Sequence, residues 1–469
     1  MTFTTADYAV IIGYFAIIFY VGFVYARRRE AGDSLKEDFI LAGRKLTLPL
    51  FVATLVATWY GSILGVGEFT YTSGIVAWTS FGLPYYIAAL LFAWFAAKKI
   101  RASDVTSIPE YFTQKFGLSA GRIASLLVLV ITVPAAYALM LGTIVQIFTG
   151  WELWQCMIVG AVLSLAYILT GGFRADVFTN VAQFIFMYLG FGILLYFCWQ
   201  QLGSPGDMLL KLPPAHKALL GTNSWQYALA WFIIALQTFI DPSFHQRCSA
   251  AETPKIAQRG IFVSVAFWLI FDFLTISTGL YARAFLTDLA QPLMAFPALG
   301  EAVLPPLFKG IFMVALLATV MSTLDSYAFL SGVTIGNDIL HPVLKRVFKR
   351  EFSVKALTQL GLLISSVLSV YFAIRIPTAI GLIYNAASIA VPGMLVPLLI
   401  SYNRTYFLKE KTVVPIMIIS AGISLFWINA PQNLGLKNIE PMIPGIILSL
   451  VSSLFFLKKH HHESRQPAG

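Results

Sequence analysis

The feature that most constrains this chain is its succession of long apolar runs. Crossing a hydrocarbon layer of about 30 Å takes roughly 20 apolar residues in a helix. Only 12% of the 469 residues are charged, against about 25% in soluble domains, so the chain is not a water-soluble enzyme and its solvent is lipid. Thirteen runs of sufficient length occur, at 8–26, 47–72, 75–97, 122–149, 153–171, 177–201, 224–243, 259–285, 305–337, 353–375, 377–402, 412–430 and 441–457.

The distribution of basic residues predicts the orientation of these spans. The first run has no preceding basic residue and ends in Arg27-Arg28-Arg29, which indicates an anchored helix and not a cleaved signal peptide. With the N-terminus outside and the loops alternating, 26 of the 32 Lys and Arg residues fall on the inner side, as the positive-inside rule requires. We therefore expect a multi-pass protein of the cell membrane with a cytoplasmic C-terminus. The net charge of +10 then needs no nucleic-acid partner.

Two of the runs carry the marks of interrupted helices. The second, at 56–68, contains three glycines and several hydroxyl groups, and the seventh has a polar patch before Pro242. Transporters use such breaks at the midplane to hold ions and substrate. The two broken spans lie five helices apart, so they enter the membrane from opposite sides. This pattern predicts an inverted repeat, spans 2 to 6 against spans 7 to 11, with the substrate site between the broken helices.

The ninth run supplies hydroxyl oxygens at helical spacing. Thr319, Ser322, Thr323 and Ser326 lie within two turns and largely on one face. Sodium needs about five oxygens, and hydroxyls together with freed backbone carbonyls supply them without a net charge. Asp325 lies beside them, and a carboxylate inside the membrane indicates a functional site.

Five segments resemble motifs of the sodium:solute symporter family, in order and over nearly the whole chain. They are 37–44 (EDFILAGR), 106–112 (TSIPEYF), 171–175 (GGFRA), 245–251 (HQRCSAA) and 321–326 (MSTLDS). The resemblance implies an all-α membrane protein with a leucine-transporter-type core of five plus five helices, one helix before it and two after. The implied divisions are a first helix and loop at 1–46, the repeats at 47–201 and 202–402, two final helices at 403–457 and a cytoplasmic tail at 458–469, which contains His460-His461-His462.

The resemblance also implies the position of the sodium ion. Its ligands would be the hydroxyls of Ser322 and Thr323 and the backbone carbonyls of Thr319, Leu55 and Thr58.

One departure concerns a second cation. Family members commonly carry Thr-Asp on the sixth span, whereas this chain has Thr179-Asn180. Asp325 stands where a serine ligand would be, so a second site would consist of Asp325, Ser326 and Asn180. Either the acid has moved to the opposite wall of the site, or the second site is lost; we favour a single sodium ion.

The broken spans also predict the substrate contacts. Matching them places Ser62, Gln237, Thr238 and Asp241 near the substrate, with Trp59, Tyr60, Phe81 and Tyr85 as aromatic walls. Aromatic faces beside a few hydrogen-bonding groups suit a small polar solute. Sugar, amino acid and organic acid all stay open.

The predicted function is sodium-coupled import of such a solute by alternating access, with Na⁺ as the coupling ion. We expect a lipid-embedded protein that functions as a monomer and is not an enzyme. The rival within transporters is a proton-coupled carrier that titrates Asp325 or Asp241. A membrane enzyme would need paired catalytic acids or a metal cluster, and a sensor would need a signalling domain that the short tail after Leu457 has no room for.

Overall fold

The computed structural model describes the chain except residues 1, 26–34, 377, 404, 431–438 and 460–469. Arg27-Arg28-Arg29 and the histidines of the tail lie outside the described residues. The first part of the chain consists of α1 (Thr5–Tyr20), η1 (Val21–Tyr25), α2 (Leu35–Leu41), η2 (Ala42–Arg44), α3 (Leu48–Trp59), α4 (Ile63–Ser73), η3 (Trp78–Gly82), α5 (Leu83–Phe92), η4 (Ala93–Ala97), α6 (Lys98–Ala102), α7 (Ile108–Phe116), α8 (Leu118–Thr132), α9 (Ala135–Thr149) and α10 (Leu153–Leu202).

The second part is helical as well, apart from one short two-stranded sheet. Its elements are α11 (Pro205–Lys211), α12 (Pro214–Lys217), α13 (Trp225–Ala235), η5 (Leu236–Ile240), α14 (Pro242–Ala250), α15 (Pro254–Phe285), η6 (Pro292–Met294), α16 (Ala295–Val303), α17 (Phe308–Val333), η7 (Thr334–Leu340), α18 (His341–Phe348), α19 (Val354–Arg375), α20 (Ala379–Ser401), β1 (Tyr406–Phe407), α21 (Glu410–Ile428), α22 (Met442–Phe456) and β2 (Lys458–Lys459). The two strands pair antiparallel, with Tyr406 opposite Lys459.

The described helices agree with a multi-pass membrane protein. Nine are long and apolar enough to cross a membrane, and the count reaches eleven if each of two bent pairs is one span. The 50-residue α10 would be about 75 Å long if it were straight, which is more than twice the hydrocarbon thickness. It is interrupted at Gly172, where φ is +60°, and so contains the two runs predicted at 153–171 and 177–201. The count of thirteen spans and the domain boundaries stay predictions.

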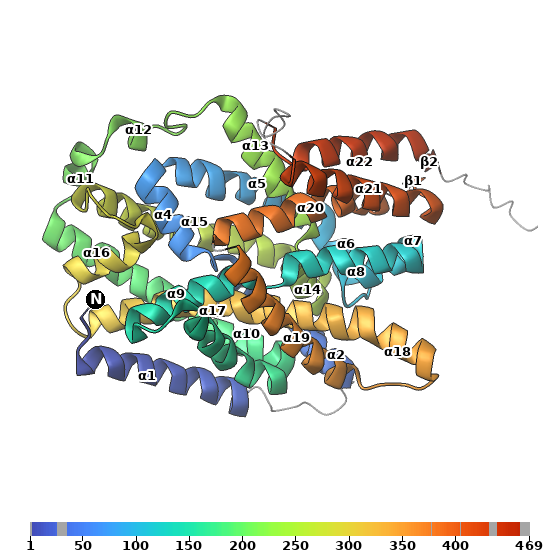
Figure 1. Ribbon diagram of the computed structural model, residues 1–469, viewed down its shortest axis with the longest axis horizontal. Helices are drawn as coiled ribbons and strands as arrows, with labels where there is room; N and C mark the ends of the chain where they lie inside the picture. Colours follow the sequence, from blue (N-terminus) through green and yellow to red (C-terminus); the bar gives the residue numbers. More distant parts are fainter. Residues whose placement is uncertain (1, 26–34, 377, 404, 431–438, 460–469) are drawn as a thin grey trace, which may run out of the picture.

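Helix α17 forms the centre of the bundle. All residues of α17 except Phe308 and Ile311 are buried, and the helix packs against α1, α3, α9, α10 and α19. Figure 1 shows α1 along one edge of the molecule and α21 and α22 at the opposite edge. A polar residue on α17 therefore faces other helices and not lipid, which places its hydroxyls and its aspartate in the interior.

The predicted run at 122–149 contains a break that we did not expect. Helix α8 ends at Thr132 and α9 begins at Ala135, because Val133 has extended backbone angles (ψ 115°) and is followed by Pro134. Proline has no backbone N–H and disfavours helical geometry at the preceding residue. Residues on both sides of this break line the cavity described below.

Candidate sodium and substrate site

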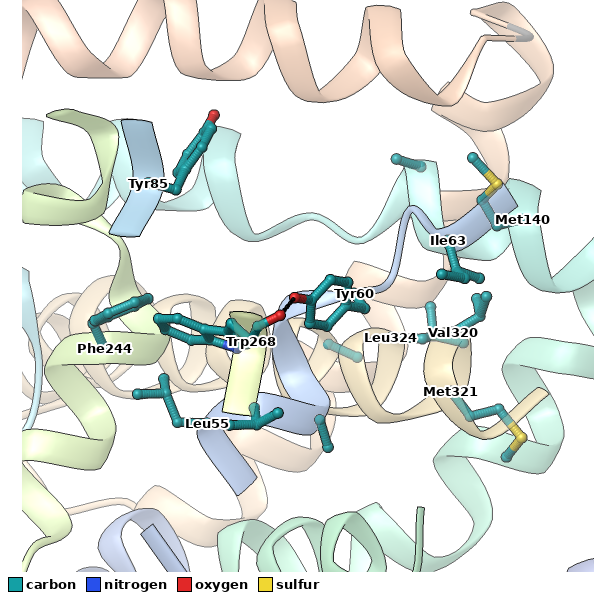
Figure 2. Packing of buried hydrophobic residues seen from close by; sticks show 14 of the residues in the cluster. Leu55, Tyr60, Ile63, Tyr85, Met140, Phe244, Trp268, Val320, Met321 and Leu324 are labelled. Atoms are coloured by element: carbon teal, nitrogen blue, oxygen red, sulfur yellow. Dashed lines mark hydrogen bonds between the residues drawn. The ribbon is translucent and has the colours of Figure 1, made fainter. Parts of the chain in front are cut away.

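The break in the second span is observed where the glycines predict it. Helix α3 ends at Trp59, α4 begins at Ile63, and their axes are bent by 58°. Figure 2 shows the unwound connection, in which the hydroxyl of Tyr60 donates to the carbonyl of Trp268 at 3.1 Å. At Gly61 a Cβ atom would lie 2.5 Å from the Cβ of Thr323. Only glycine permits the connection to approach α17 this closely.

Five oxygen atoms from α3 and α17 gather at this break. The Ser322 hydroxyl donates to the carbonyl of Ala57 at 2.7 Å and to that of Thr319 at 3.0 Å. The Thr323 hydroxyl donates to the carbonyl of Thr58 at 2.8 Å. Carbonyls in the last turn of a helix have no helical partner, so the break is what frees those of Ala57 and Thr58. All four side chains other than that of Ala57 are polar, and all are buried.

The donor set fits a small hard cation. It consists only of oxygens, carries no net charge and lies away from solvent, and hard cations prefer oxygen ligands. Of the predicted ligands, the structure brings together Ser322, Thr323, Thr319 and Thr58. The carbonyl of Ala57, which was not predicted, also meets a hydroxyl. The predicted carbonyl ligand at Leu55 stays a prediction.

The residues predicted for a second cation divide into two groups. Asp325 accepts hydrogen bonds from the hydroxyls of Ser164 and Tyr167 on α10. Ser326 instead donates to Asp176 at 2.7 Å, and the amide of Asn180 approaches Ser326 at 3.4 Å and Asp176 at 3.2 Å. Consecutive residues on a helix point about 100° apart, so Asp325 and Ser326 face different neighbours.

A buried ion pair occupies the second of these groups. Arg247 and Asp176 are 3.1 Å apart and both side chains are fully buried. The sequence argument counted Arg247 among the cytoplasmic loop residues because the apolar run was expected to end at 243. In the structure the seventh span breaks near Asp241 and continues as α14, bent by 41°, which carries Arg247 into the interior.

A cavity of about 630 Å³ adjoins the broken second span. Its volume is within the range of about 300–1,000 Å³ that is usual for small-molecule sites. Seven of the eight residues predicted for the substrate site line it: Trp59, Tyr60, Ser62, Phe81, Tyr85, Gln237 and Asp241. The eighth, Thr238, is not among the lining residues; it is fully buried in η5.

The cavity contains two carboxylates with different surroundings. Asp241 caps α14 by accepting from the N–H of Ser243 at 2.7 Å, and it also accepts from the Tyr327 hydroxyl at 2.8 Å. Asp272 accepts from the hydroxyls of Tyr60, at 2.9 Å, and Tyr86. No Lys, Arg or His is among the described residues that line the cavity. The amide of Gln237 donates to Tyr85 at 2.8 Å.

Several functional candidates were missed at the level of sequence. Asp272 lies within the apolar run at 259–285, and the sequence alone gives it no role, because its tyrosine partners lie about 190 to 210 positions away in the chain. Asp176 lies one helical turn before Asn180, so its position on the same face of that helix was a signal that could have found it. Arg247 lies within the segment 245–251 that carried the family resemblance, yet nothing in its spacing separates it from a loop arginine.

The fold is that of known transporters. Over 98% of this chain and the whole of the other, the structure superimposes on a Na⁺-coupled sialic acid symporter in its substrate-bound outward-open state, with a TM-score of 0.79 and 16% identity. The transporter MhsT in complex with L-phenylalanine matches 87% of this chain, with a TM-score of 0.52 and 14% identity. At such identities the likeness shows the fold alone. The fold is therefore of the leucine-transporter type.

The family follows from the sequence comparisons. The chain belongs to the sodium:solute symporter family, whose profile matches residues 39–405. It is 23% identical to the sodium/pantothenate symporter of Escherichia coli (strain K12) over 95% of this chain and 94% of that protein. It is 23% identical to the high-affinity choline transporter 1 of Drosophila melanogaster over 79% of this chain, but spans only 62% of that longer protein.

These comparisons confirm the predicted family, the fold class and sodium as the coupling ion. They also agree with a multi-pass membrane protein that transports a small solute. The orientation of the termini and the monomeric state stay predictions. The named solutes of the relatives differ from one another, so the substrate must be inferred from the cavity.

Proposed function

We propose that this protein is a sodium-coupled symporter that imports a small organic solute by alternating access. The observation that supports this proposal is the position of Thr58. Its carbonyl belongs to the five-oxygen set, and the same residue lines the cavity next to Trp59 and Ser62. An ion bound at the break would hold the cavity wall in one arrangement. Ion and solute would then stabilise the same conformation, which is the thermodynamic basis of coupling.

The proposed sodium ligands are the hydroxyls of Ser322 and Thr323 and the carbonyls of Ala57, Thr58 and Thr319. Each hydroxyl already lies against one of these carbonyls, so a bound ion requires only that the hydroxyls turn their lone pairs inward. A neutral site of this kind binds sodium without holding it by a fixed negative charge. That property suits an ion that must be released in every cycle.

For the solute, we propose a small molecule with an ammonium or quaternary amine group. The cavity has two carboxylates and no described basic residue, so an organic acid would enter without a counter-charge. Asp241 is already stabilised by the N-terminus of α14, whereas the partners of Asp272 among the described residues are tyrosine hydroxyls. Aromatic faces such as those of Trp59 and Tyr85 attract cations through their ring quadrupoles. Asp272 is therefore the proposed partner of the amine.

The coupling ion and the solute class can be tested on purified protein. A ligand that binds the native state raises the melting temperature. We therefore expect quaternary amines or amino acids to raise the melting temperature more in sodium buffer than in potassium buffer. The best ligand is then offered to proteoliposomes, and uptake is expected to follow an inward sodium gradient at fixed pH. Uptake driven by a pH step without sodium, and abolished in Asp325→Asn, would instead establish the proton-coupled carrier.

Replacing Asp272 by asparagine is expected to weaken binding of an amine ligand at least tenfold while leaving sodium binding within about threefold of the wild type. The physical reason is the loss of the carboxylate charge that faces the ligand's cation in a desolvated cavity. For an ammonium ligand, hydrogen bonds to this charged group are worth about 1.5–3 kcal/mol. Ligand affinity is measured by thermal shift in saturating sodium. Glu68→Gln is the matched control, since Glu68 is an acid on α4 that does not line the cavity. Tight binding of organic acids, unaffected by Asp272→Asn, would refute the proposed solute class.

A further inference from the structure

We propose that the guanidinium of Arg247 is a resident cation that fills a second cation site, so that the protein binds one sodium ion. This inference rests on the proposed function, because it concerns the number of ions in that cycle. One nitrogen of the guanidinium, Nη2, lies among four oxygens. They are Ser326 Oγ at 2.7 Å, Thr58 Oγ1 at 2.9 Å, Asp176 Oδ2 at 3.1 Å and Thr54 Oγ1 at 3.2 Å.

This arrangement is that of a coordination sphere and exceeds what ordinary hydrogen bonding requires. An NH₂ group has two hydrogens, yet four oxygens from three helices surround this nitrogen. The lone pairs are available to it, because the hydroxyl proton of Thr58 is donated to the carbonyl of Thr54 at 2.7 Å and that of Ser326 to Asp176. The other guanidinium atoms are less well matched: Nη1 reaches Gln246 only at 3.4 Å, and Nε has no described partner.

The oxygens around Nη2 continue the sodium site. Thr58 gives its carbonyl to the five-oxygen set and its hydroxyl to Arg247. Ser326 lies one helical turn beyond Ser322 on α17. The five-oxygen set and the oxygens around Nη2 therefore both come in part from α3 and α17. Thr58 contributes to both of them, as expected for two neighbouring cation sites.

The charges decide which cation occupies the second position. Asp176 supplies one negative charge, and Arg247 neutralises it within a fully buried pair. A second sodium ion would add a further charge, whereas Asp176 is the one acid among the described residues whose oxygen lies within hydrogen-bonding distance of Nη2. Asp325 does not join the group, because its carboxylate is bound by Ser164 and Tyr167.

The side chain of Arg247 also connects the two broken spans. Arg247 belongs to α14, the second part of the broken seventh span, whereas Thr54 and Thr58 belong to α3 of the broken second span. A free ion at this position would bind and dissociate, so the contact between the two spans would exist only while the ion was bound. A covalently held cation makes this contact independent of sodium concentration, and leaves the neighbouring set as the place where sodium acts.

The test is the number of sodium ions bound per protein, measured with radiolabelled sodium and no solute. We expect one ion for the wild type and two for Arg247→Met, which keeps the apolar stem and removes the charge. The double variant Arg247→Met/Asp176→Asn should return to one, because the acid that would hold the second ion is gone. Arg247→Lys keeps a tethered cation and should also bind one.

The outcomes separate this inference from the proposed function. A wild type that binds no sodium refutes both. One ion in the wild type and one in a folded Arg247→Met variant refutes the resident cation alone. Two ions in the wild type also refute it, and a return to one in Asp325→Asn would place the additional ion at Asp325. If Arg247→Met does not fold, the counts for the wild type and Arg247→Lys still decide, since either one exceeding a single ion overturns the inference.

Discussion

Sodium affinity is expected to fall about tenfold or more when Ser322 or Thr323 is replaced by alanine. Both hydroxyls are buried and lie within 3.0 Å of a backbone carbonyl at the break. A hydrogen bond or ligand contact to a charged group is worth about 1.5–3 kcal/mol, and 1.4 kcal/mol corresponds to a tenfold change in affinity. The measurement is the sodium concentration that gives half of the maximal increase in melting temperature.

Two variants of the same helix serve as controls. Ser331→Ala removes a buried hydroxyl of α17 that has no described hydrogen-bond partner, and it should leave the sodium dependence unchanged. Thr323→Ser keeps the hydroxyl while removing a methyl group, so its sodium affinity should be closer to that of the wild type than to that of Thr323→Ala. Wild-type sodium dependence in both alanine variants would remove the proposed site.

The second large effect is expected on stability. Asp176→Asn should lower the free energy of unfolding by about 3–5 kcal/mol, which is the usual result when one partner of a buried ion pair is removed. The physical reason is that the charge of Arg247 stays in the interior without the carboxylate to which it is hydrogen bonded. The loss is expected as a fall in melting temperature that additional sodium does not reverse, since sodium cannot compensate a buried positive charge.

A comparison of single and double variants isolates the pair. Arg247→Met/Asp176→Asn removes both charges and should be more stable than Asp176→Asn alone, because coupled residues give non-additive effects. Glu252→Gln, a change at an exposed acid just after α14, should leave the melting temperature unaltered. A melting temperature of Asp176→Asn equal to that of the wild type would mean that the ion pair contributes nothing to the folded state.

The treatment of Arg247 shows where reasoning from sequence reached its limit. Assigning basic residues to loops works when a membrane span ends where its apolar run ends. Under that assumption, residues 244–259 form a cytoplasmic loop. The structure continues the seventh span through a break at Asp241 and buries Arg247 completely. Hydropathy treats an arginine as expensive in lipid, and it does not register that an aspartate on another helix will neutralise it.

For Asp325 and Asp272, the sequence shows the buried acid but not its hydrogen-bond partners. Both were visible as acids in apolar runs, and such residues are reliably buried and functional candidates. Their partners, Tyr167 for the first and Tyr60 for the second, are about 160 and 210 residues away in sequence. No periodicity within a single run contains that information.

The sequence by itself determined the membrane class, the family, the breaks in the second and seventh spans and the helix that carries the hydroxyls. These properties are local: the length of an apolar run, the glycines and proline within it, and the spacing of side chains along one helix. Only the tertiary structure decided that the carbonyl of Ala57 meets Ser322, and that Asp176 and not Asp325 shares a group with Ser326. Those choices depend on how helices far apart in the chain are bent and rotated against one another, and packing of the whole bundle sets these angles.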